Sequence, residues 1–360
     1  MRIDPWGSDV FDYARLRDDF GIEPFEPFEK KIKNPHHLMR RGIVFGQRGF
    51  KIILDALNSN SEFVVLTGMM PSGRMHIGHK MVVDQIIWYQ ERGAEICIPI
   101  ADFESYATRN ISLKEAESIA IQEYVVNYIA LGLKPKKCRI YFQSKNDRMK
   151  DFAFLLARKI NLSEMRAIYG FSGETNISHL WSPIIQVSDI LHPQLDGPKP
   201  TVVPVGVDQD PHIRLTRDVA SRYKDIKLIP PASTYHRFMT GLTGQKMSSS
   251  DPKSAIFLTD TEEEVIKKIW EAKTGGRETT QRQKELGGIP EECMIYELYL
   301  YHLVEDDNRL REIYEECKAG SILCGDCKDR AFNLIIDFLN RHKERREQAK
   351  NKVEDYLEYY

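Results

Sequence analysis

Residues 63–79 read FVVLTGMMPSGRMHIGH, and this stretch decides the fold. The apolar run Phe63–Thr67 has the length and composition of a buried strand, and the glycines and proline after it predict a turn. A helical pattern then runs from about His79 to Glu91 and ends before Gly93. The stretch therefore predicts a strand, a glycine-rich turn and a helix, in that order.

Further strand-like runs follow along the chain, with helical patterns between them. They lie at Ile96–Ile100, Arg139–Gln143 and Thr201–Gly206. Regular alternation of strands and helices is typical of a parallel sheet covered by helices. We therefore predict an α/β fold whose main domain, residues 61–251, is a Rossmann-like, doubly wound parallel sheet.

The pattern changes after residue 252. Thr261 and Glu264 have the spacing of a capping box, which predicts a helix through Trp270 that the pair Gly275–Gly276 ends. The remaining segments all have helical patterns. We predict three parts: an N-terminal extension over residues 1–60, the sheet domain over 61–251 and an all-helical domain over 252–360.

Composition limits the classes of function. The 360 residues are 42% hydrophobic and 29% charged, as in globular proteins, and the length predicts two or three domains. A net charge of −2 gives no general attraction to polyanions, so any contact with nucleic acid must be local. No apolar run is long enough for a membrane span, and the first residues do not resemble an export signal. We expect a cytoplasmic protein with no membrane partner.

Two stretches carry residues suited to chemistry on phosphates. In the first, His76 and His79 lie three residues apart at a helix start, where backbone N–H groups and the helix dipole favour anions, and Gly78 between them allows a close approach. In the second, GQKMSSSDP at 244–252, Lys246 lies in a glycine- and serine-rich loop that could close over phosphates. Taken singly, the histidines could be a helix cap and the loop a solvated linker.

Taken together, the two stretches resemble the paired signatures of class I aminoacyl-tRNA synthetases. The second signature has serine where many members carry a second lysine. Further stretches are similar to the archaeal and eukaryotic tryptophanyl-tRNA synthetases: Asp4–Trp6, His36–Ile43, Val207–Pro211, Arg214–Ala220 and Ser254–Asp260. The resemblance covers nearly the whole chain.

The resemblance implies that the protein activates tryptophan with Mg-ATP and transfers it to its tRNA. It implies a homodimer, a catalytic sheet domain and a helical anticodon-binding domain. His76, His79 and Lys246 are the expected catalytic residues. The expected ATP contacts are His76, Gly78, His79, Gly206, Asp208, Lys246, Met247 and Ser248. A tyrosine-specific ligase and a catalytically silent RNA-binding paralogue are the alternatives.

The resemblance also implies an amino-acid pocket. Its ammonium acceptors correspond to Glu104, Gln186 and Gln209. Leu66 and Pro99 stand where eukaryotic-type enzymes hold the indole nitrogen with tyrosine and glutamine, so that contact is not carried over. Asp189 matches the aspartate that reads the side chain in bacterial tryptophan enzymes and in tyrosyl enzymes, and we assign it to the indole N–H. Leu66 disfavours tyrosine, because leucine cannot pair a phenol hydroxyl.

Four of the six cysteines have the spacing of a metal site: Cys293, Cys317, Cys324 and Cys327. Four thiolates can bind zinc or a [4Fe–4S] cluster, and spacing does not choose between them. Some tryptophanyl-tRNA synthetases carry a cluster with a similar spacing, one residue shorter in the long gap. We prefer the iron–sulfur cluster, with zinc second, while four reduced cysteines are the alternative.

Overall fold

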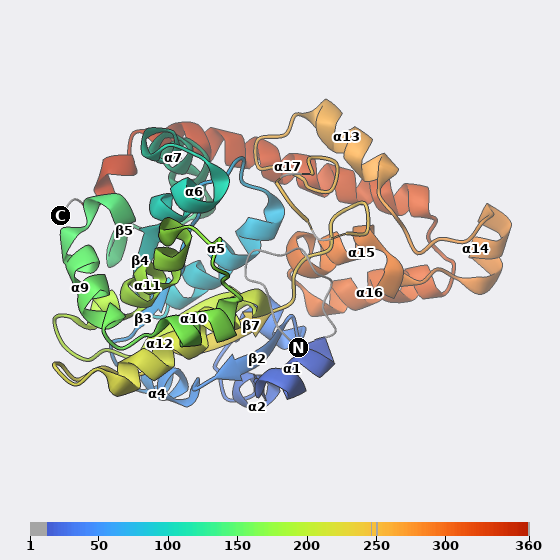
Figure 1. The fold of residues 1–360 in the computed structure, drawn as a ribbon. Coiled ribbons are helices and arrows are strands. Elements are labelled where there is room, and N and C mark those ends of the chain that lie inside the picture. Colours follow the sequence, from blue (N-terminus) through green and yellow to red (C-terminus); the bar gives the residue numbers. More distant parts are fainter. Residues whose placement is uncertain (1–12, 246, 250, 359–360) are drawn as a thin grey trace. The chain divides into compact units, whose positions relative to one another are not determined.

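The computed structural model describes residues 13–245, 247–249 and 251–358. They form two compact units (Figure 1). The sheet unit contains Val82–Arg237 with the chain up to Gly73 and from Ala349 onward. The helical unit contains Arg74–Met81 and Phe238–Gln348. The boundary therefore passes through the helix that carries the first signature.

The sheet unit is built on seven strands in the order β1-β2-β7-β6-β3-β4-β5. The five strands from β7 to β5 are parallel, whereas β1 and β2 run antiparallel at one edge. The chain starts the parallel part at β3, so its order changes direction between β3 and β6, where doubly wound sheets bind ligands. The strands are β1 Glu23–Pro24, β2 Val44–Arg48, β3 Val64–Leu66, β4 Glu95–Ile100, β5 Cys138–Phe142, β6 Thr201–Gly206 and β7 Ala232–His236.

The predicted α/β fold class is confirmed, and four strands lie where the apolar runs predicted them. These four, β3 to β6, are mostly buried along their length, as parallel strands covered on both faces must be. Three strands were missed. In β2 a glycine and two polar residues interrupt the run, and β7 buries Ser233, Thr234 and His236. Neither segment has the continuous apolar character that identifies a buried strand.

Twelve α-helices belong mainly to the sheet unit among the described residues. Three of them, α9, α11 and α12, pack through a cluster that includes Phe152, Val187 and Leu215. The helices are α1 Tyr13–Phe20, α2 Glu26–Glu29, α3 His37–Arg40, α4 Lys51–Ser59, α5 Ile77–Gln90, α6 Asp102–Arg109, α7 Leu113–Ile119, α8 Val126–Leu131, α9 Asp147–Ala157, α10 Leu162–Tyr169, α11 Ile177–Leu191 and α12 Asp210–Arg222.

The predicted helical C-terminal part is confirmed as well. The capping box is present: the Thr261 side chain accepts from the Glu264 backbone, and the Glu264 side chain accepts from the Thr261 backbone. The helices are α13 Glu262–Glu271, α14 Thr280–Leu286, α15 Met294–Leu298, α16 Asp307–Lys318 and α17 Cys324–Lys350. No described helix is long and apolar enough to cross a membrane.

Candidate functional site

The first signature forms the start of α5 and lies in the helical unit. His76 Nδ1 accepts from the Gly78 backbone at 3.1 Å, and His79 Nδ1 accepts from the His76 backbone at 3.2 Å. The two rings stack with their centroids 3.8 Å apart. Burial lowers the pKa of His79 to about 4. Burial also lowers the pKa of His76, and repulsion from a charged His79 adds to this effect. Both imidazoles are therefore neutral, and because Nδ1 accepts, Nε2 carries the proton and is a donor.

The second signature approaches the first at Gly78. A Cβ atom on Gly78 would lie 3.0 Å from the His76 ring and 3.3 Å from the Met247 sulfur. The absence of a side chain at Gly78 therefore lets His76 and Met247 pack close to the backbone. The Ser248 backbone donates to the Ser254 hydroxyl at 3.3 Å. Lys246 lies outside the described residues, so the structure does not test its predicted role.

Backbone pairing joins the first signature to the segment after the second. His76 and Phe257 form an antiparallel bridge, and the Ile77 N–H donates to the Ile256 carbonyl at 3.0 Å. In addition, the Ser249 hydroxyl donates to the Arg74 carbonyl at 3.1 Å. The serine that replaces a second lysine thus contacts the residues that lead into the first signature.

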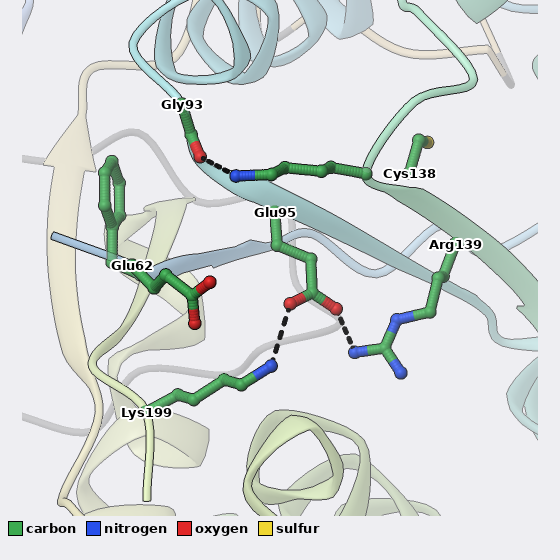
Figure 2. A pocket seen from close by; sticks show the side chains of 8 residues that line it. Glu62, Gly93, Glu95, Cys138, Arg139 and Lys199 are labelled. Carbon is green, nitrogen blue, oxygen red and sulfur yellow. Dashed lines mark hydrogen bonds and ion pairs between the residues drawn. The ribbon is translucent and has the colours of Figure 1, made fainter. Parts of the chain in front are cut away.

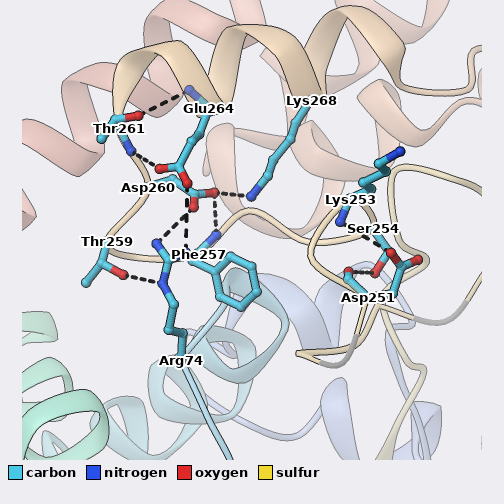
Figure 3. A network of polar contacts seen from close by, with 10 residues as sticks. All are labelled: Arg74, Asp251, Lys253, Ser254, Phe257, Thr259, Asp260, Thr261, Glu264 and Lys268. Carbon is cyan, nitrogen blue, oxygen red and sulfur yellow. Dashed lines mark hydrogen bonds and ion pairs between the residues drawn. The ribbon is translucent and has the colours of Figure 1, made fainter.

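A buried ion network holds this pairing in place, and Figure 3 shows its members. Asp260 is fully buried and binds Arg74 at 3.0 Å and Lys268 at 2.6 Å. It also accepts from the Phe257 backbone at 2.9 Å, and the Arg74 guanidinium lies 4.5 Å from the centre of the Phe257 ring. Arg74 and Lys268 share the carboxylate of Asp260, so the network links the start of the first signature to the segment after the second. Sequence reasoning had not identified Arg74 as part of a site.

The carboxyl edge of the sheet holds a second group of polar side chains. Asp189 in α11 is buried and accepts from the Tyr141 hydroxyl at 2.7 Å and from the Gln143 amide at 2.6 Å. Burial raises the pKa of Asp189 to about 7, the two hydrogen bonds oppose the rise, and the charges of Asp102 and Glu104 add to it. Both donors select the ionised form of Asp189.

Tyr141 and Gln143 were missed by sequence reasoning. Tyr141 lies in β5, and Gln143 is the first residue after this strand, two positions beyond Tyr141. Residues two apart on a strand point to the same face, so a period-two pair of polar residues at a strand end was the available signal.

The expected ammonium acceptors lie at the same edge of the sheet unit. The Gln186 amide donates to the Gln209 side-chain oxygen at 3.3 Å, so the structure brings these two together. Glu104 lies in the first turn of α6, and its charge reaches Asp189.

The other expected residues of the sheet unit lie at strand ends or beside them. Leu66 ends β3 and is buried in one apolar cluster with Tyr141. Pro99 in β4 is opposite Tyr141 in the register. Gly206 ends β6, and Asp208 is buried in the turn that follows it.

A pocket of about 310 Å³ lies at the opposite, amino edge of the parallel strands. Figure 2 shows the Glu95 carboxylate between Arg139 and Lys199, which both bind it, Lys199 at 3.1 Å. Lys137 donates to the Gly93 carbonyl at 3.4 Å. None of the expected site residues lines this pocket. Its ion pairs join the start of β4, the start of β5 and the segment before β6, which is a structural role.

The four cysteines lie near one another in the helical unit. Burial and the neighbouring thiols Cys293 and Cys324 raise the pKa of Cys317 to about 11. Burial, with the charges of Cys293 and Cys317, also raises the pKa of Cys327 to about 12, and a hydrogen bond between the Cys327 thiol and the Tyr299 hydroxyl opposes the rise. Among the described residues, no three His, Cys, Asp or Glu side chains form a group that could hold a metal ion.

The pair Cys324 and Cys327 differs from expectation in its local structure. In the sequence the two cysteines flank Gly325–Asp326, a pair typical of a tight turn, whereas in the structure they form the first turn of α17. Residues three apart lie on one face of a helix, so both thiols still point the same way.

Comparisons with known proteins place this geometry in context. The family model for class I tRNA synthetases (W and Y) matches residues 58–340. The tryptophan--tRNA ligase of Methanocaldococcus jannaschii is 55% identical over 364 residues, covering 99% of this chain and 98% of that protein. The tryptophan--tRNA ligase of Methanopyrus kandleri is 48% identical, and the match covers 99% of this chain and 96% of that protein. The crystal structure of a tryptophanyl-tRNA synthetase from Aeropyrum pernix K1 is similar with a TM-score of 0.91 and 46% identity, covering 99% of this chain and all of that one.

Proposed function

Because the chain belongs to the class I tRNA synthetases of the tryptophan and tyrosine group, we propose that it activates tryptophan with ATP and transfers it to its tRNA. The observation that carries the proposal is 55% identity to a tryptophan--tRNA ligase over 99% of the chain, with both signatures present. The family inferred from the sequence is confirmed. The reaction joins the tryptophan carboxylate to the α-phosphate of ATP, releases pyrophosphate, and passes the aminoacyl group to the terminal ribose of the tRNA.

The histidines of the first signature are proposed to bind the ATP phosphates. Their neutral rings present Nε2–H donors, and the start of α5 adds the positive end of a helix dipole. Such donors stabilise the charge that builds as pyrophosphate leaves, without forming a covalent intermediate. Lys246, with Met247 and Ser248, is proposed to add the second set of phosphate contacts.

Magnesium is proposed to enter with ATP. Mg²⁺ in nucleotide sites is held largely by substrate phosphates and water rather than by a protein cage. Gly206 and Asp208, at the end of β6, are proposed to contact the adenosine, as the direction change between β3 and β6 favours.

Tryptophan is proposed to bind at the carboxyl edge of the sheet unit. Glu104, Gln186 and Gln209 are acceptors suited to its ammonium group, and the contact between Gln186 and Gln209 supports a shared role. Asp189 is proposed to read the indole side of the substrate. Leu66 gives an aliphatic wall, which suits an indole ring better than a phenol hydroxyl.

For the cysteines we prefer a [4Fe–4S] cluster, held by Cys293, Cys317, Cys324 and Cys327. The nearness of the thiols supports it, as do Gly276 and Gly288, where a Cβ atom would come within 2.7 Å of a cysteine sulfur. A cubane takes one thiolate at each iron, so it holds sulfurs further apart than a single zinc ion does. Zinc, which four thiolates also bind, is the second choice.

Protein purified without oxygen should be brown and absorb broadly near about 400 nm. Replacing Cys324 and Cys327 together by serine should remove the colour and impair tRNA charging, while tryptophan activation continues. A colourless protein with about one zinc per chain would show that the site binds zinc instead. If anaerobic protein contains neither iron nor zinc, the proposal is wrong.

The remaining proposals concern assembly and location. We propose that the helical unit binds the anticodon, and that the protein is a cytoplasmic homodimer. Four large apolar side chains with more than half their surface exposed fall in one stretch of the sheet unit and favour a second copy as partner. They are Phe154, Leu155, Leu162 and Ile177.

ATP–pyrophosphate exchange with each of the twenty amino acids tests the main proposal. We expect exchange with tryptophan and little with tyrosine. Exchange with tyrosine alone would make the protein a tyrosine ligase, and exchange with none would indicate a silent paralogue.

A further inference from the structure

Gln143 carries a buried hydrogen-bond acceptor that the protein itself does not use. Gln143 is 4% exposed, and its amide nitrogen donates to Asp189 at 2.6 Å. Its amide oxygen has no hydrogen-bond partner among the residues that the structure describes. A buried oxygen without a hydrogen bond destabilises the folded protein. Such an atom at a candidate site points to a donor that arrives with a ligand.

The orientation of the Gln143 amide follows from its neighbour. An ionised carboxylate accepts hydrogen bonds only, so it attracts the NH₂ group of an amide and repels its oxygen. Asp189 also accepts from the Tyr141 hydroxyl on its other oxygen. The two donors hold Asp189 as an anion, and Asp189 in turn holds the Gln143 oxygen away from itself.

The surroundings are apolar and lie at the ligand-binding edge of the sheet. Tyr141, next to Gln143 in the chain, belongs to a buried cluster with Leu66 and Ile185, against which Phe103 and Trp181 also pack. Gln143 itself follows the carboxyl end of β5. Open α/β sheets bind ligands at this end of their strands. An apolar wall with one unused acceptor matches a flat ring with one N–H donor and no acceptor, which describes indole.

We propose that Gln143 is a specificity-determining residue whose side-chain oxygen accepts the indole N–H of tryptophan, while Asp189 orients its amide. The inference deepens the proposed function and rests on it. The rival arrangement has Asp189 accept the indole N–H directly, since a carboxylate can accept more than two hydrogen bonds.

The test compares tryptophan with 3-benzothienylalanine, in which sulfur replaces the indole N–H and the ring shape is nearly kept. The quantity measured is the ratio of kcat/KM for the two amino acids in ATP–pyrophosphate exchange. In the unmodified protein we expect a ratio of about 5 to 150 in favour of tryptophan, because the analogue leaves a buried acceptor unpaired. In Gln143→Met, which keeps length but removes the amide, the ratio should fall to about 3 or less.

Tyr141→Phe is the matched control, because it also takes one donor from Asp189 but leaves the Gln143 amide and its oxygen in place. It should keep the ratio of the unmodified protein even if it weakens both amino acids. If Gln143→Met keeps the ratio, Asp189 reads the indole directly and the proposal is wrong.

A second variant covers the case in which Gln143→Met does not fold. Gln143→Asn keeps the amide but withdraws its oxygen by one methylene, and it should also lose the preference for tryptophan. Retention of the preference in a folded Gln143→Asn protein would overturn the proposal. Absence of exchange with tryptophan in the unmodified protein would instead overturn the proposed function, so the two failures can be told apart.

Discussion

The two edges of the parallel sheet treat buried charge differently. At the amino edge, Glu95 is surrounded by Arg139 and Lys199, and its negative charge is met by two cations of this chain. At the carboxyl edge, Asp189 has neutral donors only, and the amide of Gln143 that binds it keeps an oxygen unused. The first arrangement stabilises the fold, whereas the second leaves capacity for a ligand. A well-formed pocket such as the one at the amino edge therefore need not be the functional site.

The largest expected effect on tryptophan binding at the carboxyl edge comes from Asp189→Ala. The change removes the partner of two buried donors and releases the Gln143 amide. We expect tryptophan binding to weaken by about 1–3 kcal/mol, roughly 5- to 150-fold, with ATP binding retained. Fluorescence or calorimetric titration of each substrate measures both quantities.

Lys246→Ala is a control in which the activation rate should fall while tryptophan binding is retained. Loss of one charge contact in the transition state should lower the activation rate about a hundredfold or more, while tryptophan affinity changes little.

Equal loss of tryptophan and ATP binding in Asp189→Ala would show that Asp189 supports the fold rather than substrate recognition.

The pH dependence of tryptophan binding gives the next largest effect. Burial raises the pKa of Asp189 to about 7, so the carboxylate takes up a proton as the pH falls through that value. A protonated Asp189 no longer fixes the Gln143 amide. Tryptophan affinity should therefore fall by up to about tenfold for each unit below pH 7. Tyr141→Phe removes a hydrogen bond that favours the anion, so it should move the inflection to higher pH. An inflection that does not move would contradict the assignment to Asp189.

Stability should change with pH in the opposite direction. The pKa of Asp189 in the folded protein lies above its ordinary value of 3.8, so ionisation opposes folding. Asp189 therefore stabilises the folded protein most when it is protonated, below about pH 4. This contribution to the free energy of unfolding is lost as the pH rises through about 7. Asp189→Asn should remove this component from denaturant titrations at several pH values.

Glu95→Gln gives the smallest expected effect on activity and sharpens the contrast. Arg139 and Lys199 would lose a partly buried anionic partner, which should lower the free energy of unfolding by about 1–3 kcal/mol. Tryptophan-dependent exchange should stay within about twofold, because the residue is far along β4 from the carboxyl edge. Glu26→Gln, which breaks an exposed pair with Lys30, is the matched control and should not change stability measurably. A large loss of exchange in Glu95→Gln would show that the amino edge takes part in function.

Sequence reasoning identified four adjacent strands, β6, β3, β4 and β5, but not the three strands on the other side of β6. Strand β6, Thr201–Gly206, was predicted with its bounds because it is a continuous apolar run. Strand β7 was missed because Ser233, Thr234 and His236 are buried there by tertiary packing, which local composition does not report. The two-residue strand β1 is too short for any periodic signal.

The candidate site was predictable where a motif carried it. His76, Gly78 and His79 were identified by their spacing at a helix start, and Asp189 by resemblance. Gln143 and Arg74 were not, because their roles depend on contacts far apart in the chain: Gln143 meets Asp189 from 46 residues away, and Arg74 meets Asp260 from 186 residues away. Such contacts follow from the fold, and no local pattern announces them.

A crystal structure of the protein with tryptophan bound tests the central claim most directly. The account predicts that the amino acid lies at the carboxyl edge of the sheet unit, with its indole nitrogen about 2.7–3.2 Å from the side-chain oxygen of Gln143. Tryptophan in the Glu95 pocket, or an indole nitrogen paired with another acceptor, would contradict it.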